Sequence, residues 1–169
     1  MEYSVDDFIQ CLERHETATL ALNHWCAGKL PGARSLHAQV LQDVAIPPQA
    51  HDGQLVTAPE ETLRHRRVCL NWGNTTVSEA DNWYLPDRLP RAMREQLERS
   101  TVPFGQVVMD LRPVRTRISQ TKEEPGEGGS SRFILHVTAL MCMADGTPIA
   151  EVREHYRREL LCLAATDAY

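Results

Sequence analysis

The sequence predicts a single domain of the α+β class. Its 169 residues fit one ordinary domain. Most of the expected strands follow one another through short turns, and the expected helices gather near the start and in the middle of the chain. Such an order favours a sheet of hairpin-linked strands over a regular alternation of strand and helix. We therefore expect one α+β domain over residues 1–169.

The first part of the chain predicts helix and then strand. Apolar residues recur at three- and four-residue spacing from residue 4 to about residue 26, as in an amphipathic helix. The polar stretch 15–17 is a point at which this region can divide into two helices. A loosely alternating strand is expected over 35–46. Two consecutive prolines end it, so 47–61 is expected to be an exposed connection.

The middle of the chain predicts a hairpin followed by a helix. Residues 67–72 and 75–84 have the composition of strands, and Gly73–Asn74 between them is typical of a tight turn. A helix is expected from the proline at position 90 to about Arg99. A second tight turn, at 103–105, follows it.

The last part of the chain predicts three more strands. They are expected at 111–119, 133–142 and 148–163, the last two joined by a turn. The segment 122–131 is rich in glycine, serine and glutamate and is expected to be a mobile loop. Such a loop is compatible with either covering a pocket or staying open.

The amino-acid composition indicates which kinds of partner this protein is expected to have. The formal charge is -5, with 18 Lys and Arg against 23 Asp and Glu, so we expect neither nucleic acid nor an anionic membrane as a partner. No apolar run reaches the length of a membrane span, and the acidic start does not resemble an export signal. We therefore expect a cytoplasmic protein, monomeric or homodimeric. The usual catalytic and metal-binding motifs are missing from the sequence, so no metal is expected.

Three local patterns, taken in order, resemble the chorismate pyruvate-lyase family. The first is Arg67–Leu70, which heads a hairpin that ends at Pro86. The second is Val102–Gly105, which follows a helix. The third is Gly146–Pro148, which leads to Glu154 and an aromatic residue. Members of this family eliminate pyruvate from chorismate and form 4-hydroxybenzoate for ubiquinone biosynthesis.

The resemblance implies a fold and two possible functions. The fold is a single antiparallel sheet of about six strands with helices packed on it, around a small ligand cavity. The first function is a cofactor-independent lyase acting on chorismate or a close analogue. Because effector-binding domains of some bacterial transcription regulators share this architecture, the alternative is a non-catalytic domain that binds an aromatic carboxylate.

The resemblance also implies which residues form the site. Arg67 would hold the ring carboxylate of the substrate, and the backbone N–H of Phe104 would contact the same group. The main chain of Ala18 would border the ligand. Glu154 would act near the 4-hydroxyl end as the acid or base, with Glu151 as a rival, because residues three apart face opposite sides of a regular strand.

Two departures from the family pattern concern the substrate. Asn82 lies where the family has a second arginine, so one positive charge is missing. Ala18 replaces a methionine and leaves more space. Both favour a further alternative, an enzyme of the same fold acting on a different cyclohexadiene or hydroxybenzoate. In each case the partner is a small acidic molecule, and no cofactor is implied.

Overall fold

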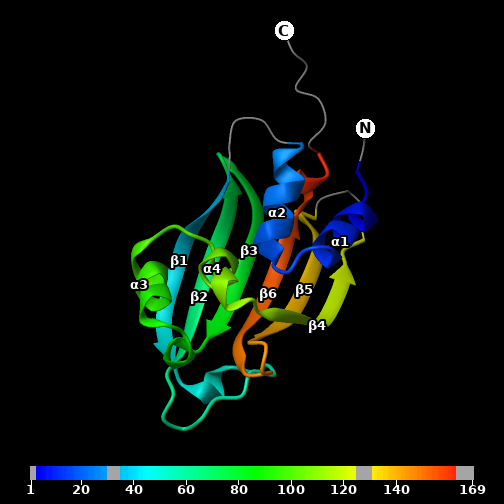
Figure 1. The fold of residues 1–169 in the computed structure, drawn as a ribbon. Coiled ribbons are helices and arrows are strands. Elements are labelled where there is room, and N and C mark those ends of the chain that lie inside the picture. Colours follow the sequence, from blue (N-terminus) through cyan, green and yellow to red (C-terminus); the bar gives the residue numbers. More distant parts are fainter. Residues whose placement is uncertain (1–2, 30–34, 125–130, 163–169) are drawn as a thin grey trace.

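The chain folds into one antiparallel sheet with helices on one face (Figure 1). In a computed structural model, residues 3–29, 35–124 and 131–162 are described. The six strands lie in the order β1-β2-β3-β6-β5-β4, which confirms the predicted α+β class and the single six-stranded sheet. The strands are β1 (Leu36–Ile46), β2 (Leu63–Trp72), β3 (Thr75–Tyr84), β4 (Val114–Lys122), β5 (Phe133–Cys142) and β6 (Pro148–Arg157).

In the described part of the chain, four α-helices lie on one face of the sheet, the front face as drawn in Figure 1. They are α1 (Val5–Glu13), α2 (Ala18–Ala27), α3 (Arg91–Arg99) and α4 (Phe104–Val107). The predicted division of the first helical region is confirmed. The Thr17 hydroxyl accepts a hydrogen bond from the Leu20 amide and caps α2. This cap allows a second helix to begin immediately after the turn that ends α1.

Three strands differ by more than one residue from their predicted limits, and β1 starts one residue later than predicted, at Leu36. β2 starts at Leu63, four residues earlier than predicted, because Leu63 still pairs with the last residue of β1. β4 starts at Val114 because residues 109–111 form a 3-10 turn and Arg112 adopts a left-handed conformation. β6 ends at Arg157, before the predicted limit. Of the predicted loop 122–131, Lys122 is the last residue of β4, and 125–130 lie outside the described residues.

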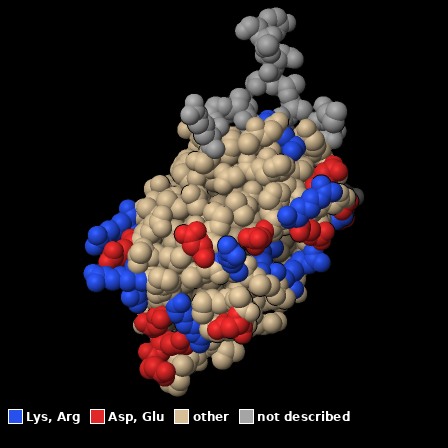
Figure 2. All heavy atoms as spheres, viewed as in Figure 1, with Lys and Arg blue, Asp and Glu red and all other residues tan. Residues whose placement is uncertain are grey.

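Most of the core lies between the sheet and the helices, in two clusters, and a third, smaller cluster of Leu55, Leu63, Trp83 and Leu85 lies on the opposite face. One joins α1 and α2 to the sheet and contains Phe8, Trp25 and Tyr156; the other joins α3 and α4 to the sheet and contains Leu97 and Phe104. On the same face, Figure 2 shows charged side chains gathered in the lower half and at the sides, with mostly uncharged atoms above. The apolar interior therefore lies between the helices and the sheet, and a cavity can form there.

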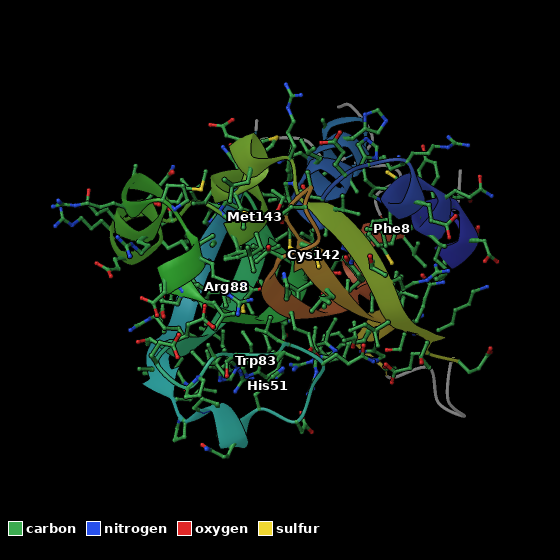
Figure 3. The ribbon with its side chains drawn as sticks, turned by 60° about the horizontal axis from the view of Figure 1, so that its bottom comes forward. Phe8, His51, Trp83, Arg88, Cys142 and Met143 are labelled. Atoms are coloured by element: carbon green, nitrogen blue, oxygen red, sulfur yellow. The ribbon has the colours of Figure 1, made fainter. Side chains whose placement is uncertain are left out.

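The opposite face is partly covered by the connection between β1 and β2. Glu151 of β6 is buried beneath this connection and accepts hydrogen bonds from the amides of Gln54 and Leu55, at 2.6 and 3.0 Å. His51 Nε2 lies 3.1 Å from the same carboxylate, and its ring packs on Trp83, beside which it is labelled in Figure 3. Glu151 thus fastens the predicted exposed connection to the sheet.

We expect Gly53→Ala to destabilise the protein by about 1–3 kcal/mol. A methyl group at Gly53 would overlap the Glu151 carboxylate, so the connection must shift and lose hydrogen bonds to a buried acceptor. Gly28→Ala is the matched control, because no atom of the described residues, apart from the adjacent backbone, lies within 4 Å of the added methyl group. Urea unfolding measures both. Equal free energies of unfolding for the two variants would contradict this role of Glu151.

Candidate ligand-binding cavity

A cavity lies between the helix-bearing face of the sheet and the starts of α2 and α4. Its empty space, including the mouth that opens to solvent, is about 470 Å³. Most of the wall is apolar, and a few polar groups converge on it, as in small-molecule sites. The lining residues are Thr17, Ala18, Thr19, Leu22, Val68, Leu70, Ser78, Ala80, Asn82, Pro103, Phe104, Gly105, Arg115, Met141, Val152, Glu154 and Tyr156.

The first turns of α2 and α4 meet at the cavity. A Cβ atom at Gly105 would lie 2.7 Å from the Thr19 hydroxyl oxygen, so glycine allows the two turns to approach closely. Ala18 and Phe104 are the first residues of these helices, and their amides have no acceptor among the described residues. Free amides at the start of a helix attract negative charge. Because α4 has only four residues, the start of the ten-residue α2 is the part of the wall that suits an acidic group.

A buried group of three side chains closes the other side of the cavity. Arg115 of β4 forms an ion pair with Glu154 of β6, and the Tyr156 hydroxyl donates to the same carboxylate at 2.8 Å. Tyr156 is fully buried and Glu154 nearly so. This group holds together two strands that β5 separates.

The pKa values in this group follow from burial and from the Glu154 charge. Burial alone would lower the pKa of Arg115, but the neighbouring Glu154 carboxylate raises it above the ordinary value. Burial, reinforced by Glu154, raises the pKa of the Tyr156 hydroxyl well above its ordinary value. Arg115 therefore stays charged and Tyr156 stays a hydrogen-bond donor at neutral pH.

Arg66 is a second buried cation on the helix-bearing face. Its side chain is 0% exposed, and its three guanidinium nitrogens have no hydrogen-bond acceptor among the described residues. Its Nε lies 3.9 Å from Asp43, whose carboxylate is already bonded to Arg64 at 2.8 Å and to the Tyr84 hydroxyl at 3.1 Å. Burial lowers the pKa of Arg66.

Arg66 is placed beside the cavity by the pairing of two strands. It lies opposite Asn82 in the β2–β3 pair, and Asn82 lines the cavity. A buried guanidinium without acceptors is costly, so acceptors from water or a ligand are required there.

The structure brings together three of the four residues that the resemblance predicted. Ala18, Phe104 and Glu154 all line the cavity, and Asn82 lines it too. Glu154 and Glu151 face opposite sides of the sheet, as expected from strand geometry, and only Glu154 reaches the cavity. The functional roles of these residues stay predictions.

Arg67, which the resemblance assigns to the substrate carboxylate, does not reach the cavity. Its side chain is 54% exposed and pairs with Asp81 at 3.2 Å on the opposite face of the sheet. There it borders a separate surface hollow together with Glu79 and His155. Side chains alternate along a strand, so the neighbouring Arg66 is the arginine that points toward the helices.

Sequence reasoning missed Arg115, which lines the cavity, and Arg66, which lies beside it. For Arg66 a signal existed, because Val68 and Leu70 are apolar and share its side of the strand, which marks that side as the buried one. For Arg115 no comparable signal existed, since most of β4 is exposed and polar.

Comparison with solved structures defines the class of fold. The chain superimposes on PhnF from Mycobacterium smegmatis with a TM-score of 0.57 and 14% identity, over 91% of this chain and 69% of that one. The effector domain of PhnF alone matches with a TM-score of 0.55 and 14% identity, over 91% of this chain and 96% of the domain. The ligand-binding domain of a putative GntR-family regulator from Bordetella bronchiseptica matches with a TM-score of 0.53 and 16% identity, over 76% and 86%. The fold is therefore that of GntR-family ligand-binding domains, which is chorismate lyase-like.

Sequence comparison gives the family. No protein-family model matches the chain. It is 31% identical over 173 aligned positions to the uncharacterized protein y4mC of Sinorhizobium fredii, covering 90% of this chain and 73% of y4mC. The chain belongs to the family of y4mC.

These comparisons bear on the expected partners only in part. The structural neighbours are domains of transcription regulators, so the expected exclusion of nucleic acid gains no support from them. Within the described ranges, no helix is both long and apolar enough to cross a membrane. The same ranges contain no group of three or more His, Cys, Asp or Glu side chains that could hold a metal ion.

Proposed function

We propose that this chain is a binding domain for a small molecule that carries an anionic group and an apolar body. The observation that carries the proposal is Arg66, a fully buried guanidinium with no acceptor among the described residues. A carboxylate or phosphate would supply both the missing acceptors and the opposite charge. The free amide of Ala18, at the start of α2, favours the same kind of group.

The remaining cavity wall suits the rest of such a ligand. Leu22, Val68, Phe104 and Met141 offer an apolar surface, and Asn82 offers one donor and one acceptor. The innermost space holds only about two or three water molecules. A ring-sized ligand therefore requires some of the lining side chains to move outward.

Binding without catalysis is favoured over the lyase reaction by the state of Glu154. Its carboxylate is already engaged by Arg115 and by the Tyr156 hydroxyl. It cannot act on a substrate without giving up these partners. The arginine assigned to the substrate carboxylate, Arg67, also lies on the opposite face. A lyase acting on chorismate or an analogue is the second candidate, since Glu154 does line the cavity as that reaction requires.

Thermal unfolding with matched ligands tests the proposal. We expect benzoate to raise the melting temperature, and benzamide, which has the same shape but no charge, to leave it unchanged. Inorganic phosphate distinguishes a site for any anion from one that also needs an apolar body. A ligand at a hundredfold excess over its Kd adds about 2.7 kcal/mol of stability. If benzoate, 4-hydroxybenzoate and phosphate all leave unfolding unchanged, the proposal is wrong.

A second assay separates the two candidate functions. The protein is incubated with chorismate, and 4-hydroxybenzoate absorbance is followed together with pyruvate release. The binding function predicts stabilisation by an aromatic carboxylate without either product. Formation of both products would move the assignment to the lyase.

A further inference from the structure

Asp43 of β1 places a carboxylate beside the unsatisfied guanidinium of Arg66. Its Oδ2 atom lies 3.9 Å from Arg66 Nε, too far for a hydrogen bond. The same carboxylate accepts hydrogen bonds from Arg64 Nε at 2.8 Å and from the Tyr84 hydroxyl at 3.1 Å. The Asp43 side chain is only 16% exposed. A negative charge is therefore held within the protein, close to the cation that lacks acceptors. We call these four residues the Asp43 cluster.

The Asp43 cluster adjoins the ligand cavity through two of its members. The Tyr84 ring packs on the ring of Phe104, with 5.5 Å between the ring centroids, and Phe104 lines the cavity. Arg66 lies opposite Asn82 in the β2–β3 pair, and Asn82 lines the cavity too. An anion that enters the cavity and binds to Arg66 would therefore come close to the Asp43 carboxylate.

The charges of the Asp43 cluster do not cancel. Arginine side chains stay protonated at neutral pH, so Arg64 and Arg66 supply two positive charges, and Asp43 supplies one negative charge. Burial, reinforced by the Asp43 charge, raises the pKa of the Tyr84 hydroxyl to about 12, so this group stays neutral. The cluster is left with one positive charge in excess.

The remaining charged side chains at the cavity balance each other. Among the described residues that line it, Arg115 and Glu154 are the charged ones, and they form an ion pair. A buried site holds an ionic ligand best when the opposite charges match, because little water is present to solvate an excess charge. The excess to be matched here is the single positive charge of the Asp43 cluster.

We propose that Asp43 selects the charge of the ligand, so that the cavity takes a molecule with a single carboxylate rather than a dianion such as a phosphate monoester. This inference rests on the proposed function. A carboxylate would neutralise the excess charge and supply acceptors for Arg66. A second negative charge would lie near Asp43 without a counter-ion. Asp43 acts through the charge that it places beside Arg66 and need not touch the ligand.

Two aromatic ligands of different charge test the selection in the whole chain. Benzoate carries one negative charge. Phenyl phosphate carries about two at pH 8, since the second pKa of a phosphate monoester is about 6. By calorimetric titration at pH 8 we expect the wild-type chain to bind benzoate about tenfold or more tightly than phenyl phosphate.

Substitution of Asp43 separates the effect of charge from that of ligand size. Asp43→Asn removes the negative charge and keeps an oxygen that can accept from Arg64. The excess then becomes two positive charges, so the preference for benzoate over phenyl phosphate should fall about tenfold or more. Asp81→Asn is the matched control, because Asp81 pairs with His65 and Arg67 on the opposite face of the sheet. It should leave the preference unchanged.

The outcomes separate this inference from the proposed function. A wild-type chain that binds phenyl phosphate as tightly as benzoate overturns the selection by Asp43, whether or not the Asp43→Asn variant folds. A folded Asp43→Asn variant that keeps the wild-type preference, or an equal change in Asp81→Asn, overturns it as well. In these cases an anion still binds, and the proposed function stands. A wild-type chain that binds neither a carboxylate nor a phosphate contradicts the proposed function and this inference together.

Discussion

Arg115→Met is expected to lower the free energy of unfolding by about 3–5 kcal/mol. Arg115 and Glu154 form a buried ion pair, and Tyr156 donates to the same carboxylate. Methionine fills much of the space of the arginine stem but leaves the Glu154 charge buried without its counter-ion. Removing one member of such a pair costs far more than the pair itself contributes.

Two further variants separate loss of the ion pair from loss of packing. Adding Glu154→Gln to Arg115→Met removes the uncompensated charge and keeps an acceptor for Tyr156, so most of the stability should return. Arg117→Met lies on the same strand but removes only exposed contacts, an ion pair with Glu13 and a hydrogen bond to Gln120, which should cost about 0–1 kcal/mol. Urea unfolding at neutral pH gives all three values. An Arg115→Met variant no less stable than Arg117→Met would show that the buried pair does not stabilise the fold.

The fold class could be predicted from local sequence patterns because most strands of the sheet pair with the strand that comes next in the sequence. The β2–β3 and β5–β6 hairpins have tight turns, and both turns contain a glycine with positive φ, Gly73 and Gly146. A glycine-containing turn between two runs of strand-forming residues can be recognised in the sequence and predicts a hairpin. The central β3–β6 pairing joins segments far apart in the chain, and no local pattern reports it.

The choice between Arg66 and Arg67 shows where local patterns fail. Adjacent residues on a strand face opposite sides, so an error of one position transfers a side chain from the core to the solvent. Residues 64–67 read Arg-His-Arg-Arg, and this run offers a candidate on either face. Aligning the run with a family motif selected Arg67, whereas the buried Val68 and Leu70 assign Arg66 to the inner face.

The Arg115–Glu154 pair could not be predicted for a different reason. The two residues lie on β4 and β6, with β5 between them, and their contact depends on the order of strands in the sheet. An edge strand with several exposed charged residues gives no sign that one of them reaches inward. Glu154 was found only because the resemblance extends to the final hairpin.

Arg66→Met is expected to raise the stability of the ligand-free protein, by about 1–4 kcal/mol. Arg66 is buried with three nitrogens that lack acceptors, and Asp43 is already engaged by Arg64 and Tyr84. An apolar side chain of similar length removes the desolvation cost of the charge and keeps the packing. The same substitution should abolish the stabilisation by benzoate, because the group that attracts the anion is gone.

Arg67→Met is the matched control for this prediction. It removes the neighbouring arginine, which is exposed and pairs with Asp81 on the other face. We expect a change of about 0–1 kcal/mol and an unaltered response to benzoate. Thermal and urea unfolding of both variants, with and without benzoate, give the four comparisons. If Arg66 stabilises the fold only through packing, Arg66→Met will be less stable than Arg67→Met. Benzoate will then still raise the melting temperature of both variants. That result would remove Arg66 from the binding site.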